Sequence, residues 1–562
     1  MEPKIPFLEA TPHSKQLVVK GKPFLIRGAE LQNSSLSSAE YMKDVWPRVV
    51  EANINTVLGS VTWEHIEPEE GHFNFKDLDR IIQDAREHEL HLILLWFGSF
   101  KNGFSTYTPA WVKTDQMRFP RVKLRKAGGR MEIGNTLSIF HSEAPKADAK
   151  AFKALIQHLK EVDEKHSTVI MVQVENEVGV LGDSRDGSVA ANLKFNAPVP
   201  DDLLTFLTKD WDGLNNTIKG NLHYFRSQQS IKNSSWESAF GSSTATDELF
   251  MAYHYACYLS QVAAAGKAVY PIPLFTNVWL AKSDNDINGN PVVVSGGATP
   301  GEYPSGGGVS SVLDVWQHFA KSLDFIAPDI YQADYKNMCA AYRHRNQPLL
   351  IPEQRRDEYG ARRIWYAFGS HQAIGTAPFG IDTLEEPHNP FRNHYGLLKK
   401  VESLVLESQR RPNSTIGFFF DEAVDSRAKS ESLEATLGTW KLKIERSFVF
   451  GKPGPGFGMV IHLHDSRFLL IGEGFQVSFT SSNPNKPFTG ILHFVEKDIV
   501  DAETGELKTI RMLNGDETRN GRSCMMPGED PDYGGFPIAV TIPARTKIAE
   551  CEPYALEWDD SM

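Results

Sequence analysis

Cysteine is scarce in this chain of 562 residues, which contains only four cysteines: Cys257, Cys339, Cys524 and Cys551. They lie far apart, and their spacing matches neither a zinc motif nor the dense disulfide framework of a small secreted domain. A chain of this length can bury a large hydrophobic core without covalent cross-links. We therefore expect side-chain packing to hold the fold together.

Long apolar runs and an excess of positive charge are also lacking. No run reaches the ~18 residues of a membrane-spanning helix, and the N-terminal segment lacks the apolar region of a signal peptide. We therefore expect a cytoplasmic protein, or a secreted one whose leader was trimmed. Acidic residues outnumber basic ones by 71 to 59, a net charge of −12. Nucleic acid and anionic membranes are therefore not expected partners.

Short apolar runs alternate with helical periodicity through the first two thirds of the chain. The helical segments include 76–88 and 250–265, the latter followed by Gly266 as an expected helix end. The apolar runs, each typical of a strand buried on both faces, span residues 24–29, 56–61, 92–97, 169–174, 274–277, 325–330, 348–352 and 375–379. Eight strands that alternate with helices predict an α/β fold, a (β/α)8 TIM barrel, over residues 1–412.

Three further segments complete the predicted organisation. Residues 182–248 and 281–311 are rich in small polar residues and glycine, and they predict long loops over the carboxyl ends of the strands. From residue 413 to 562, short strands alternate with turn residues, which predicts a smaller antiparallel β-sandwich domain. We expect that domain to pack against the barrel without contributing a catalytic group.

Two carboxylates follow predicted strands of the barrel. Glu177 comes just after the fourth apolar run, and Glu353 directly follows the seventh. The carboxyl ends of barrel strands meet at one face, where such enzymes have their active sites. A pair of carboxyls there, one protonated and one ionised, is the equipment for glycoside hydrolysis. Arg355 and Arg356 would favour the ionised form of Glu353, and Asn176 could bind a sugar hydroxyl.

The two glutamates alone do not identify an active site, because an Asn-Glu dipeptide is expected by chance in a chain with 71 acidic residues. A solvated surface glutamate is the plainer interpretation of either residue taken singly. The position of the two carboxyls favours a catalytic role, since they follow the fourth and the seventh apolar run.

Several longer segments resemble glycoside hydrolase family 35. VTWEHIEPEEGHFNFKDLDRII follows the second strand as in that family, VQVENEVG resembles its acid/base segment and LLIPEQ its nucleophile segment. The segments GEYPSGGGVSSVLDVWQHFAKSLDFIAPDIY and YAFGSHQAIGTAPFGIDT resemble the branch with its own C-terminal β-domain. The resemblance implies a retaining β-galactosidase with Glu177 as acid/base and Glu353 as nucleophile.

The chain departs from the commonest pattern of that family near the sugar. The first strand ends in Arg27-Gly28-Ala29-Glu30, Trp63 is followed by Glu64, and the third strand continues as LLWFGSFKNG. These departures leave β-glucosidase and transglycosylase activity open as alternatives to β-galactosidase. A third alternative is a non-catalytic carbohydrate-binding protein, although decay of an enzyme would usually have removed one of the two glutamates.

Other residues at strand ends are candidates for binding the substrate, an oligosaccharide or polysaccharide. Each of them could instead have an ordinary packing role, and for Trp63 packing and binding are about equally expected. The candidates are Glu30, Trp63, Asn102, Asn176, Trp279 and Tyr331. Trp236, Phe240 and Tyr303 in the long loops are weaker candidates for outer sugar sites.

Neither a metal nor another cofactor is expected. The segment 284–289 opens like an EF-hand loop, but the twelfth position is Ser295 and Pro291 interrupts the flanking helix. His462 and His464 have the spacing of a metal pair on a strand, yet no third ligand stands nearby in the sequence. The sequence does not indicate an oligomeric state.

Overall fold

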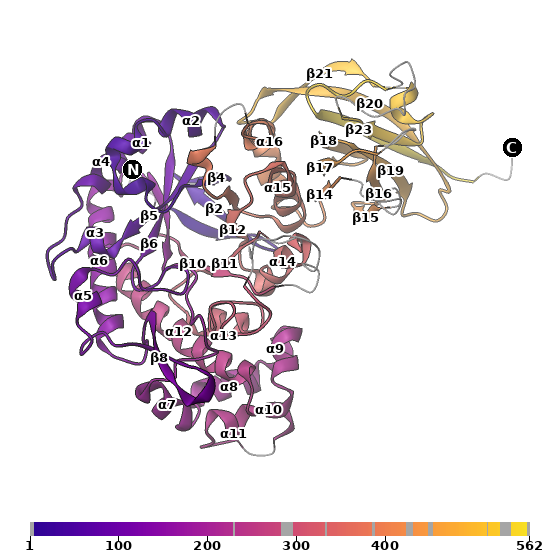
Figure 1. The fold of residues 1–562 in the computed structure, drawn as a ribbon. Helices are drawn as coiled ribbons and strands as arrows, with labels where there is room; N and C mark the ends of the chain where they lie inside the picture. Colours follow the sequence, from indigo (N-terminus) through magenta and orange to yellow (C-terminus); the bar gives the residue numbers. More distant parts are fainter. Residues whose placement is uncertain are drawn as a thin grey trace.

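The computed structural model describes residues 5–228, 231–282, 296–331, 334–384, 388–422, 431–447, 453–513, 515–528 and 541–558. The EF-hand-like segment 284–289 lies outside the described residues. Figure 1 shows a barrel of strands surrounded by helices, with the C-terminal strands (yellow) beside it. No helix within the described residues is both long and apolar enough to cross a membrane.

Within the described residues, eight parallel strands form the barrel, which confirms the predicted fold class. They are β4 (Ile26–Glu30), β5 (Thr56–Thr62), β6 (His91–Phe97), β9 (Val169–Val174), β10 (Leu274–Trp279), β11 (Phe325–Asp329), β12 (Leu350–Gln354) and β13 (Gly375–Pro378). Their order is β11-β10-β9-β6-β5-β4-β13-β12, and a parallel bridge between Ile330 and Gln354 joins the two outer strands. Apolar residues on both faces of these strands explain their nearly continuous apolar sequences.

Amphipathic helices cover the outside of the barrel. α4 (Lys76–Glu87) coincides with the predicted helix at 76–88, and both α4 and α6 (Glu143–Asp163) bury an apolar face. α12 (Thr244–Lys267) ends one residue after Gly266, close to the predicted helix end, but its C-cap is Ala268 and not the glycine. A Cβ on Gly266 would lie 2.6 Å from the ring of Phe152, so the glycine lets α12 pack closely on α6.

The remaining helices of the barrel follow the same alternation of strand and helix. α15 (Glu358–His371) follows β12, and α16 (Phe391–Ser408) follows β13. Shorter helices in the connections are α1 (Ala39–Met42), α2 (Trp46–Glu51), α3 (Trp63–Ile66), α5 (Ala110–Thr114), α13 (Leu313–Phe319) and α14 (Tyr335–Ala341).

The segment predicted as a long loop at 182–248 is largely helical. It contains α7 (Val189–Asn196), α8 (Asp201–Lys209), α9 (Asn216–Asn221), α10 (His223–Ser227) and α11 (Trp236–Phe240). These helices are short, and α7 and α9 begin at polar N-caps, Ser188 and Asn215, whose side chains accept helix N–H groups. The small polar residues of this segment therefore include helix caps as well as loop residues.

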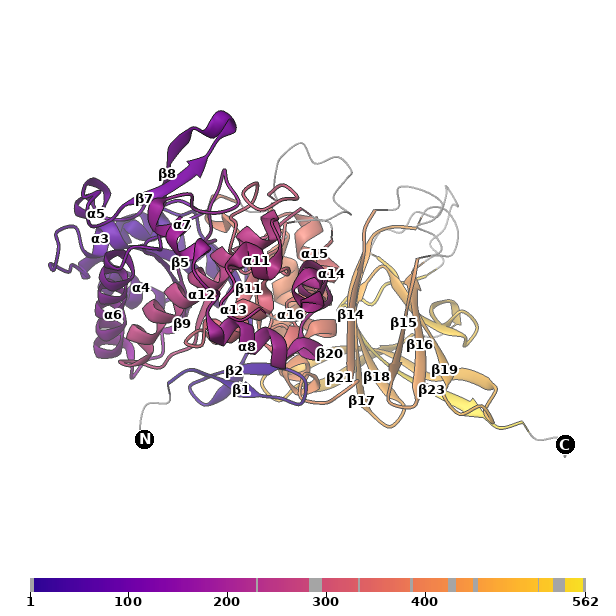
Figure 2. The ribbon, with the colours of Figure 1, turned by 90° about the horizontal axis from the view of Figure 1, so that it is seen from below.

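Two small antiparallel sheets lie at opposite ends of the barrel (Figure 2). The first consists of β1 (Phe7–Ala10), β2 (Lys15–Val19) and β3 (Lys22–Phe24), which precede the barrel. The second is the hairpin of β7 (Arg121–Arg125) and β8 (Met131–Leu137), which follows β6. The hairpin therefore rises at the carboxyl ends of the barrel strands.

The C-terminal strands form two antiparallel sheets that share an apolar core, as predicted. In the described part of the chain, one sheet has the order β14-β17-β18-β23-β20-β21 and the other β15-β16-β19-β22. Their bounds are β14 (Thr415–Phe420), β15 (Ser432–Leu437), β16 (Trp440–Arg446), β17 (Gly456–His464), β18 (Arg467–Glu473), β19 (Phe475–Ser481), β20 (Phe488–Asp501), β21 (Glu506–Met512), β22 (Ser523–Met526) and β23 (Ile548–Leu556).

Helix α15 of the barrel packs directly on β14 of the C-terminal sheets. A Cβ at Gly417 would overlap the carbonyl oxygen of Trp365, so glycine is needed for this close approach. The ring of Trp365 stacks on Phe457, with 5.6 Å between centroids. Because α15 follows the strand that carries Glu353, the C-terminal sheets support the barrel directly behind that strand.

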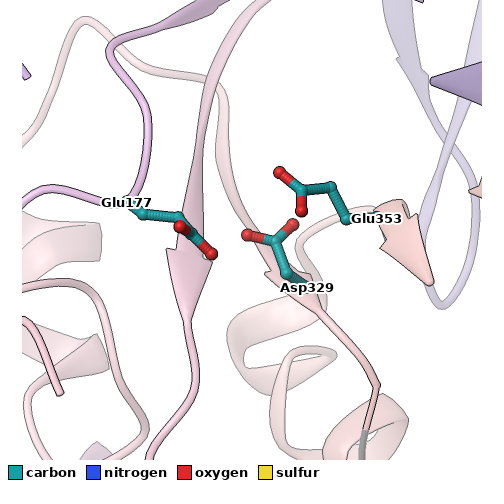
Figure 3. A group of neighbouring side chains, drawn as sticks. All are labelled: Glu177, Asp329 and Glu353. Carbon is teal, nitrogen blue, oxygen red and sulfur yellow. The ribbon is translucent and has the colours of Figure 1, made fainter. Parts of the chain in front are cut away.

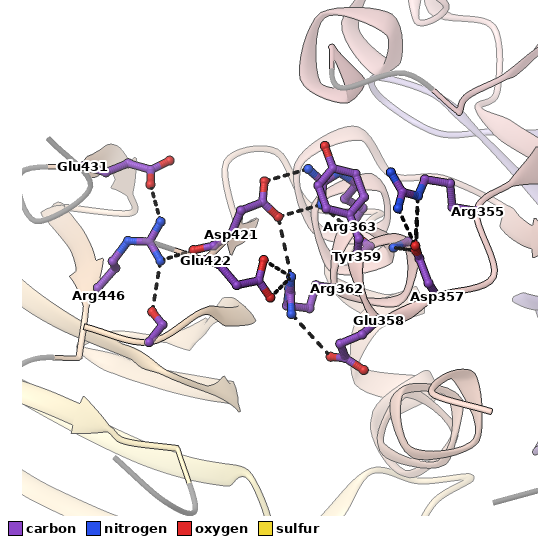
Figure 4. Close-up of polar contacts among 12 residues, drawn as sticks. Arg355, Asp357, Glu358, Tyr359, Arg362, Arg363, Asp421, Glu422, Glu431 and Arg446 are labelled. Carbon is purple, nitrogen blue, oxygen red and sulfur yellow. Dashed lines mark hydrogen bonds and ion pairs between the residues drawn. The ribbon is translucent and has the colours of Figure 1, made fainter. Parts of the chain in front are cut away.

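Charged side chains complete this contact (Figure 4). Arg363 donates two hydrogen bonds to the carboxylate of Asp421, at 2.8 and 2.7 Å. Arg362 donates to both carboxylate oxygens of Glu422, at 2.9 and 3.1 Å. We call these four residues the interdomain contact. Both arginine side chains are at most 4% exposed, so the carboxylates neutralise charges that the interface has removed from water.

Candidate active site

Three carboxyl groups meet at the carboxyl ends of the barrel strands (Figure 3). Glu177 follows β9, Asp329 ends β11 and Glu353 lies in β12. One oxygen of each lies within 4.8 Å of an oxygen of each of the others, and all three residues are buried. The two glutamates proposed from the sequence are thus brought together, and Asp329 joins them.

Asn277 in β10 connects the three carboxyl residues. Its side-chain oxygen accepts the backbone N–H of Glu177 at 2.9 Å. Its amide nitrogen donates to Asp329 at 2.8 Å and to Glu353 at 3.3 Å. The phenol of Tyr331 donates to the other oxygen of Glu353 at 2.9 Å. These bonds fix the orientation of Glu353 and the position of Glu177 before any substrate binds.

The turn that carries Glu177 has an unusual backbone. Both Glu175 and Glu177 have positive φ, 61° and 46°, a conformation that costs free energy for residues other than glycine. The buried carboxylate of Glu175 holds the turn, because it accepts the backbone N–H groups of Ser99 at 3.0 Å and Phe100 at 2.6 Å. The strained turn after β9 is therefore tied to the segment after β6.

Burial and crowding by like charge raise the pKa of Glu177 to about 8, through desolvation first and the neighbouring Glu353 second. Lys101 acts in the opposite direction. The pKa of Asp329 is also raised well above its usual range by burial and by Glu353 and Glu177. At neutral pH Glu177 therefore carries a proton, as a general acid must.

Lys101 is a buried cation beside the carboxyls. Its ammonium group donates to the side-chain oxygen of Asn176 at 3.0 Å and lies 5.0 Å from the centre of the Phe97 ring. Burial would lower its pKa, but Glu353, Glu177 and further carboxylates outweigh this and raise it. Lys101 therefore stays charged and offsets part of the negative charge at the site.

Glu30 at the end of β4 is fully buried, and neither carboxylate oxygen has a hydrogen-bond partner. Its pKa is raised well above the usual range, by burial first and then by Glu353. Buried polar atoms without a partner are rare in folded proteins, and an absent ligand or water is a common reason. We use the name carboxylate cluster for Glu30, Glu177, Asp329 and Glu353.

The structure places the other predicted residues at different distances from the cluster. Trp279 is half-buried at the end of β10, in register with Asp329, and so stands beside it. Asn102 follows β6 with a positive φ of 53°, and its buried side-chain oxygen has no partner. Trp63 is fully buried, and its indole N–H donates to Glu67 at 2.8 Å, which fits the packing role.

The aromatic residues proposed for outer sugar sites are buried. Trp236 and Phe240 are 1% and 3% exposed and pack in a group of aromatic rings. The phenol of Tyr303, also 3% exposed, donates to Glu248 at 2.7 Å. None of the three faces solvent, so their aromatic character serves packing. On the C-terminal sheets, the two histidines with the spacing of a metal pair contact Asp465: a ring nitrogen of His462 bonds its backbone oxygen at 2.9 Å, and one of His464 its carboxylate at 3.3 Å.

Sequence reasoning missed Asp329, Asn277 and Lys101. Asp329 and Asn277 each end or nearly end a predicted strand, so the rule that located Glu353 could have found them. Lys101 lies in a loop after β6 and had no such position to mark it. Three carboxylates at this spacing are also a ligand set that a divalent cation accepts.

Comparison with known families agrees with this geometry. Residues 35–217 match the beta-galactosidase family, glycoside hydrolase family 42. The matched segment includes β5, β6, β9 and Glu177, and it supports a glycosidase. Residues 391–525 match a domain of unknown function, DUF5597, which begins at α16 and runs through most of the C-terminal sheets. The motifs had suggested family 35, whereas the family whose model matches is 42.

The solved structures that match the chain are distant in sequence. The beta-galactosidase from Bacillus circulans sp. alkalophilus is 16% identical, with 68% of this chain and 57% of that chain covered and a TM-score of 0.45. The beta-amylase catalytic domain from Paenibacillus polymyxa is 12% identical, with 66% and 97% covered and a TM-score of 0.45. The chain thus spans 57% of the length of the first. No curated protein matches the chain.

Proposed function

We propose that the protein is a retaining, exo-acting β-glycosidase, and most specifically a β-galactosidase that releases terminal β-D-galactose. The observation that carries the proposal is the approach of Glu177 and Glu353, whose oxygens come within 4.8 Å of each other across the barrel mouth. Retaining glycosidases place their two carboxyls ~5–5.5 Å apart, because one must attack the sugar directly. Inverting enzymes need a wider gap for a water molecule.

In the proposed first step, a carboxylate oxygen of Glu353 attacks the anomeric carbon as the bond to the leaving oxygen breaks. Glu177 gives its proton to that oxygen, so a neutral alcohol departs and a covalent glycosyl-enzyme remains. In the second step Glu177, now ionised, removes a proton from water, which attacks the anomeric carbon and releases Glu353. Two inversions leave the β configuration unchanged.

The hydrogen bonds around Glu353 support its role as nucleophile. Tyr331 donates to one oxygen, while Asn277 and Asn176 donate to the other at 3.3 and 3.5 Å. These donors hold Glu353 in a fixed orientation for attack on the anomeric carbon. Glu177 lies beside it with a pKa raised to about 8, as suits a general acid.

The sugar specificity rests on the family match, because family 42 is described as beta-galactosidase. The proposed placement in the family 35 branch with its own C-terminal β-domain rests on motifs alone. β-Glucosidase or transglycosylase activity on the same scaffold remains the alternative, motivated by the departures at Glu30 and after Trp63. A non-catalytic carbohydrate-binding protein is the third candidate.

A panel of aryl β-glycosides separates these candidates. We expect turnover of the β-galactoside to exceed that of the β-glucoside, and hydrolysis of either excludes a binding-only protein. Proton NMR of the first-formed sugar should show the β-anomer before mutarotation. If the α-anomer appears first, the enzyme inverts and the assigned roles are wrong. Turnover should survive exhaustive dialysis against a chelator, because the mechanism requires no metal.

A further inference from the structure

A loop that precedes α13 packs against the chain that follows the proposed acid/base residue. We call residues 300–308 the support loop. Val180 and Ser305 form an antiparallel bridge, with backbone hydrogen bonds of 3.0 and 2.9 Å in the two directions. The N–H of Gly182 donates to the carbonyl oxygen of Gly301 at 2.8 Å. The support loop therefore pairs with the backbone just beyond the turn after β9.

Glycines let these two segments approach closely. A Cβ at Gly179 would lie 2.4 Å from the carbonyl carbon of Pro304, and one at Gly307 would lie 2.7 Å from the carbonyl oxygen of Val178. Main-chain atoms cannot swing aside as the end of a long side chain can, so a larger residue at either glycine would push the segments apart. The support loop thus holds the chain after Glu177 through main-chain contacts.

A buried carboxyl group on α12 holds the support loop in turn. Glu248 is only 2% exposed. One of its oxygens accepts the phenol of Tyr303 at 2.7 Å, and the other accepts the hydroxyl of Ser311, just after the loop, at 2.8 Å. The helix also contacts the loop at Gly306, where a Cβ would lie 2.5 Å from that of Met251. The loop is therefore anchored to α12.

A carboxyl group at this position costs free energy. Burial raises the pKa of Glu248 to about 7, although the hydrogen bonds from Tyr303 and Ser311 act to lower it. An apolar side chain could fill the same space without that cost, but it would leave both hydroxyl groups without an acceptor. Groups that cost stability persist where they serve a site, which directs attention to what the support loop holds.

The turn that carries Glu177 is supported from its other side as well. The N–H of Gly103, after β6, donates to the carbonyl oxygen of Glu177 at 2.9 Å. The turn therefore lies between two supports, and each depends on a buried glutamate: Glu175 on the side of β6 and Glu248 on the side of α12. Because Glu177 has a positive φ of 46°, the turn would relax if either support were lost.

We propose that Glu248 is a positioning residue for the acid step: through Tyr303 and the support loop it keeps the carboxyl group of Glu177 in place for proton transfer to the leaving oxygen. The proposal rests on the proposed function, and it adds a residue outside the carboxylate cluster. Its effect should be confined to the acid, because these contacts lead to the turn after β9, whereas Glu353 lies in β12.

Three substitutions test this role. Glu248→Leu removes both acceptors, Tyr303→Phe removes one donor, and Glu248→Gln keeps an amide oxygen that can accept and should therefore rescue the enzyme. Glu237→Leu is the matched control, since Glu237 accepts the hydroxyl of Ser242 at 3.1 Å in an exposed position. The substrates are an alkyl β-glycoside, whose leaving group needs a proton, and a dinitrophenyl β-glycoside of the same sugar, whose leaving group needs none.

For the alkyl glycoside, kcat/KM should fall about tenfold or more in Glu248→Leu and about threefold to fivefold in Tyr303→Phe, because the acid is misaligned. For the dinitrophenyl glycoside the change should be less than about twofold. Glu248→Gln and the control should behave as wild type on both substrates. Equal losses on both substrates, or a loss on neither, would overturn the proposal. If Glu248→Leu does not fold, Tyr303→Phe decides between these outcomes.

Amide hydrogen exchange tests the link between Glu248 and the turn without turnover. Exchange at Val180 and Gly182, measured by mass spectrometry on peptides covering 178–184, should quicken about tenfold in Glu248→Leu and severalfold in Tyr303→Phe. Peptides from β18 should exchange at the wild-type rate in every variant. Unchanged exchange at 178–184 would overturn the proposal whatever the activity. Faster exchange there in variants of an enzyme that hydrolyses no glycoside would support the link and reject the proposed function.

Discussion

Two groups of charged residues in this protein differ in how well their charges are matched. In the interdomain contact, Arg362 and Arg363 each face a carboxylate with two hydrogen bonds. In the carboxylate cluster, the carboxyl group of Glu30 has no hydrogen-bond partner, and Glu177 lies beside Glu353 with a raised pKa. The first arrangement is the one expected when charges only stabilise a fold.

The difference shows which group costs stability. Carboxyls whose pKa is raised on folding destabilise the native state at neutral pH, because the unfolded chain would ionise them freely. An arrangement that costs free energy persists at sites where it serves binding or catalysis. The interdomain contact, by contrast, should contribute stability and leave the chemistry unaffected. Substitutions in the two groups should therefore have opposite effects.

The largest effect is expected for Glu353→Gln. Activity should fall by more than about 10⁴-fold on every substrate, because no covalent intermediate can form without the nucleophile. The free energy of unfolding should rise by about 1 kcal/mol at pH 7, since one charge leaves the crowded cluster. Steady-state kinetics and urea unfolding measure the two quantities. An active variant would refute the assignment, and a less stable one would refute the view that the cluster is strained.

Unfolding at two pH values sharpens this test. The pKa of Glu177, Asp329 and Glu30 is raised in the folded state. Their contribution to stability is therefore full below the unfolded pKa and is lost as pH rises toward about 8. Wild type should lose more stability than Glu353→Gln between pH 5 and pH 8.

Glu177→Gln should have the next largest effect, and one that depends on the leaving group. For an alkyl or sugar leaving group, which needs a proton, kcat/KM should fall about 10²–10⁴-fold. For an aryl glycoside with an acidic phenol, formation of the intermediate should be much less affected, and the intermediate should accumulate as a burst. Equal losses on both kinds of substrate would contradict the role of Glu177 as acid.

Asp421→Asn breaks the interdomain contact. Arg363 would keep its buried guanidinium without a carboxylate, so the free energy of unfolding should fall by about 2 kcal/mol. At pH 7, kcat/KM should change less than about threefold, because Asp421 lies outside the site. Asp465→Asn is the matched control, since the Asp465 side chain is 95% exposed in the same pair of sheets. A variant as stable as this control would show that the contact contributes nothing.

Lys101→Met should give the smallest effect and the most specific one. Lys101 lowers the pKa of Glu177, so its removal should shift the alkaline limb of kcat/KM upward by about 1 pH unit. Lys101→Arg, which keeps the charge, should leave the limb nearly in place. A shift to lower pH would show that Glu177 is not the group that titrates.

Much of the barrel could be predicted from local pattern. Strands buried on both faces have nearly continuous apolar sequences, and the predicted 169–174 coincides with β9. Glu353 was found by the same logic, because a polar residue that ends such a run must lie at the mouth. The helices α7 to α11 were missed within 182–248, since they are too short for a clear period.

The sequence by itself determined the order of strands and helices and the two glutamates, because periodicity and strand ends are local properties of the chain. Only the tertiary structure decided which side chains converge. Asn277 holds Glu177 and Glu353 together, although the latter lies 76 residues away from it in the chain. Gly266 lies at the end of α12 as expected, but its close contact with Phe152 in another helix depends on the tertiary structure. Barrel closure brings such residues together, and no local pattern encodes those distances.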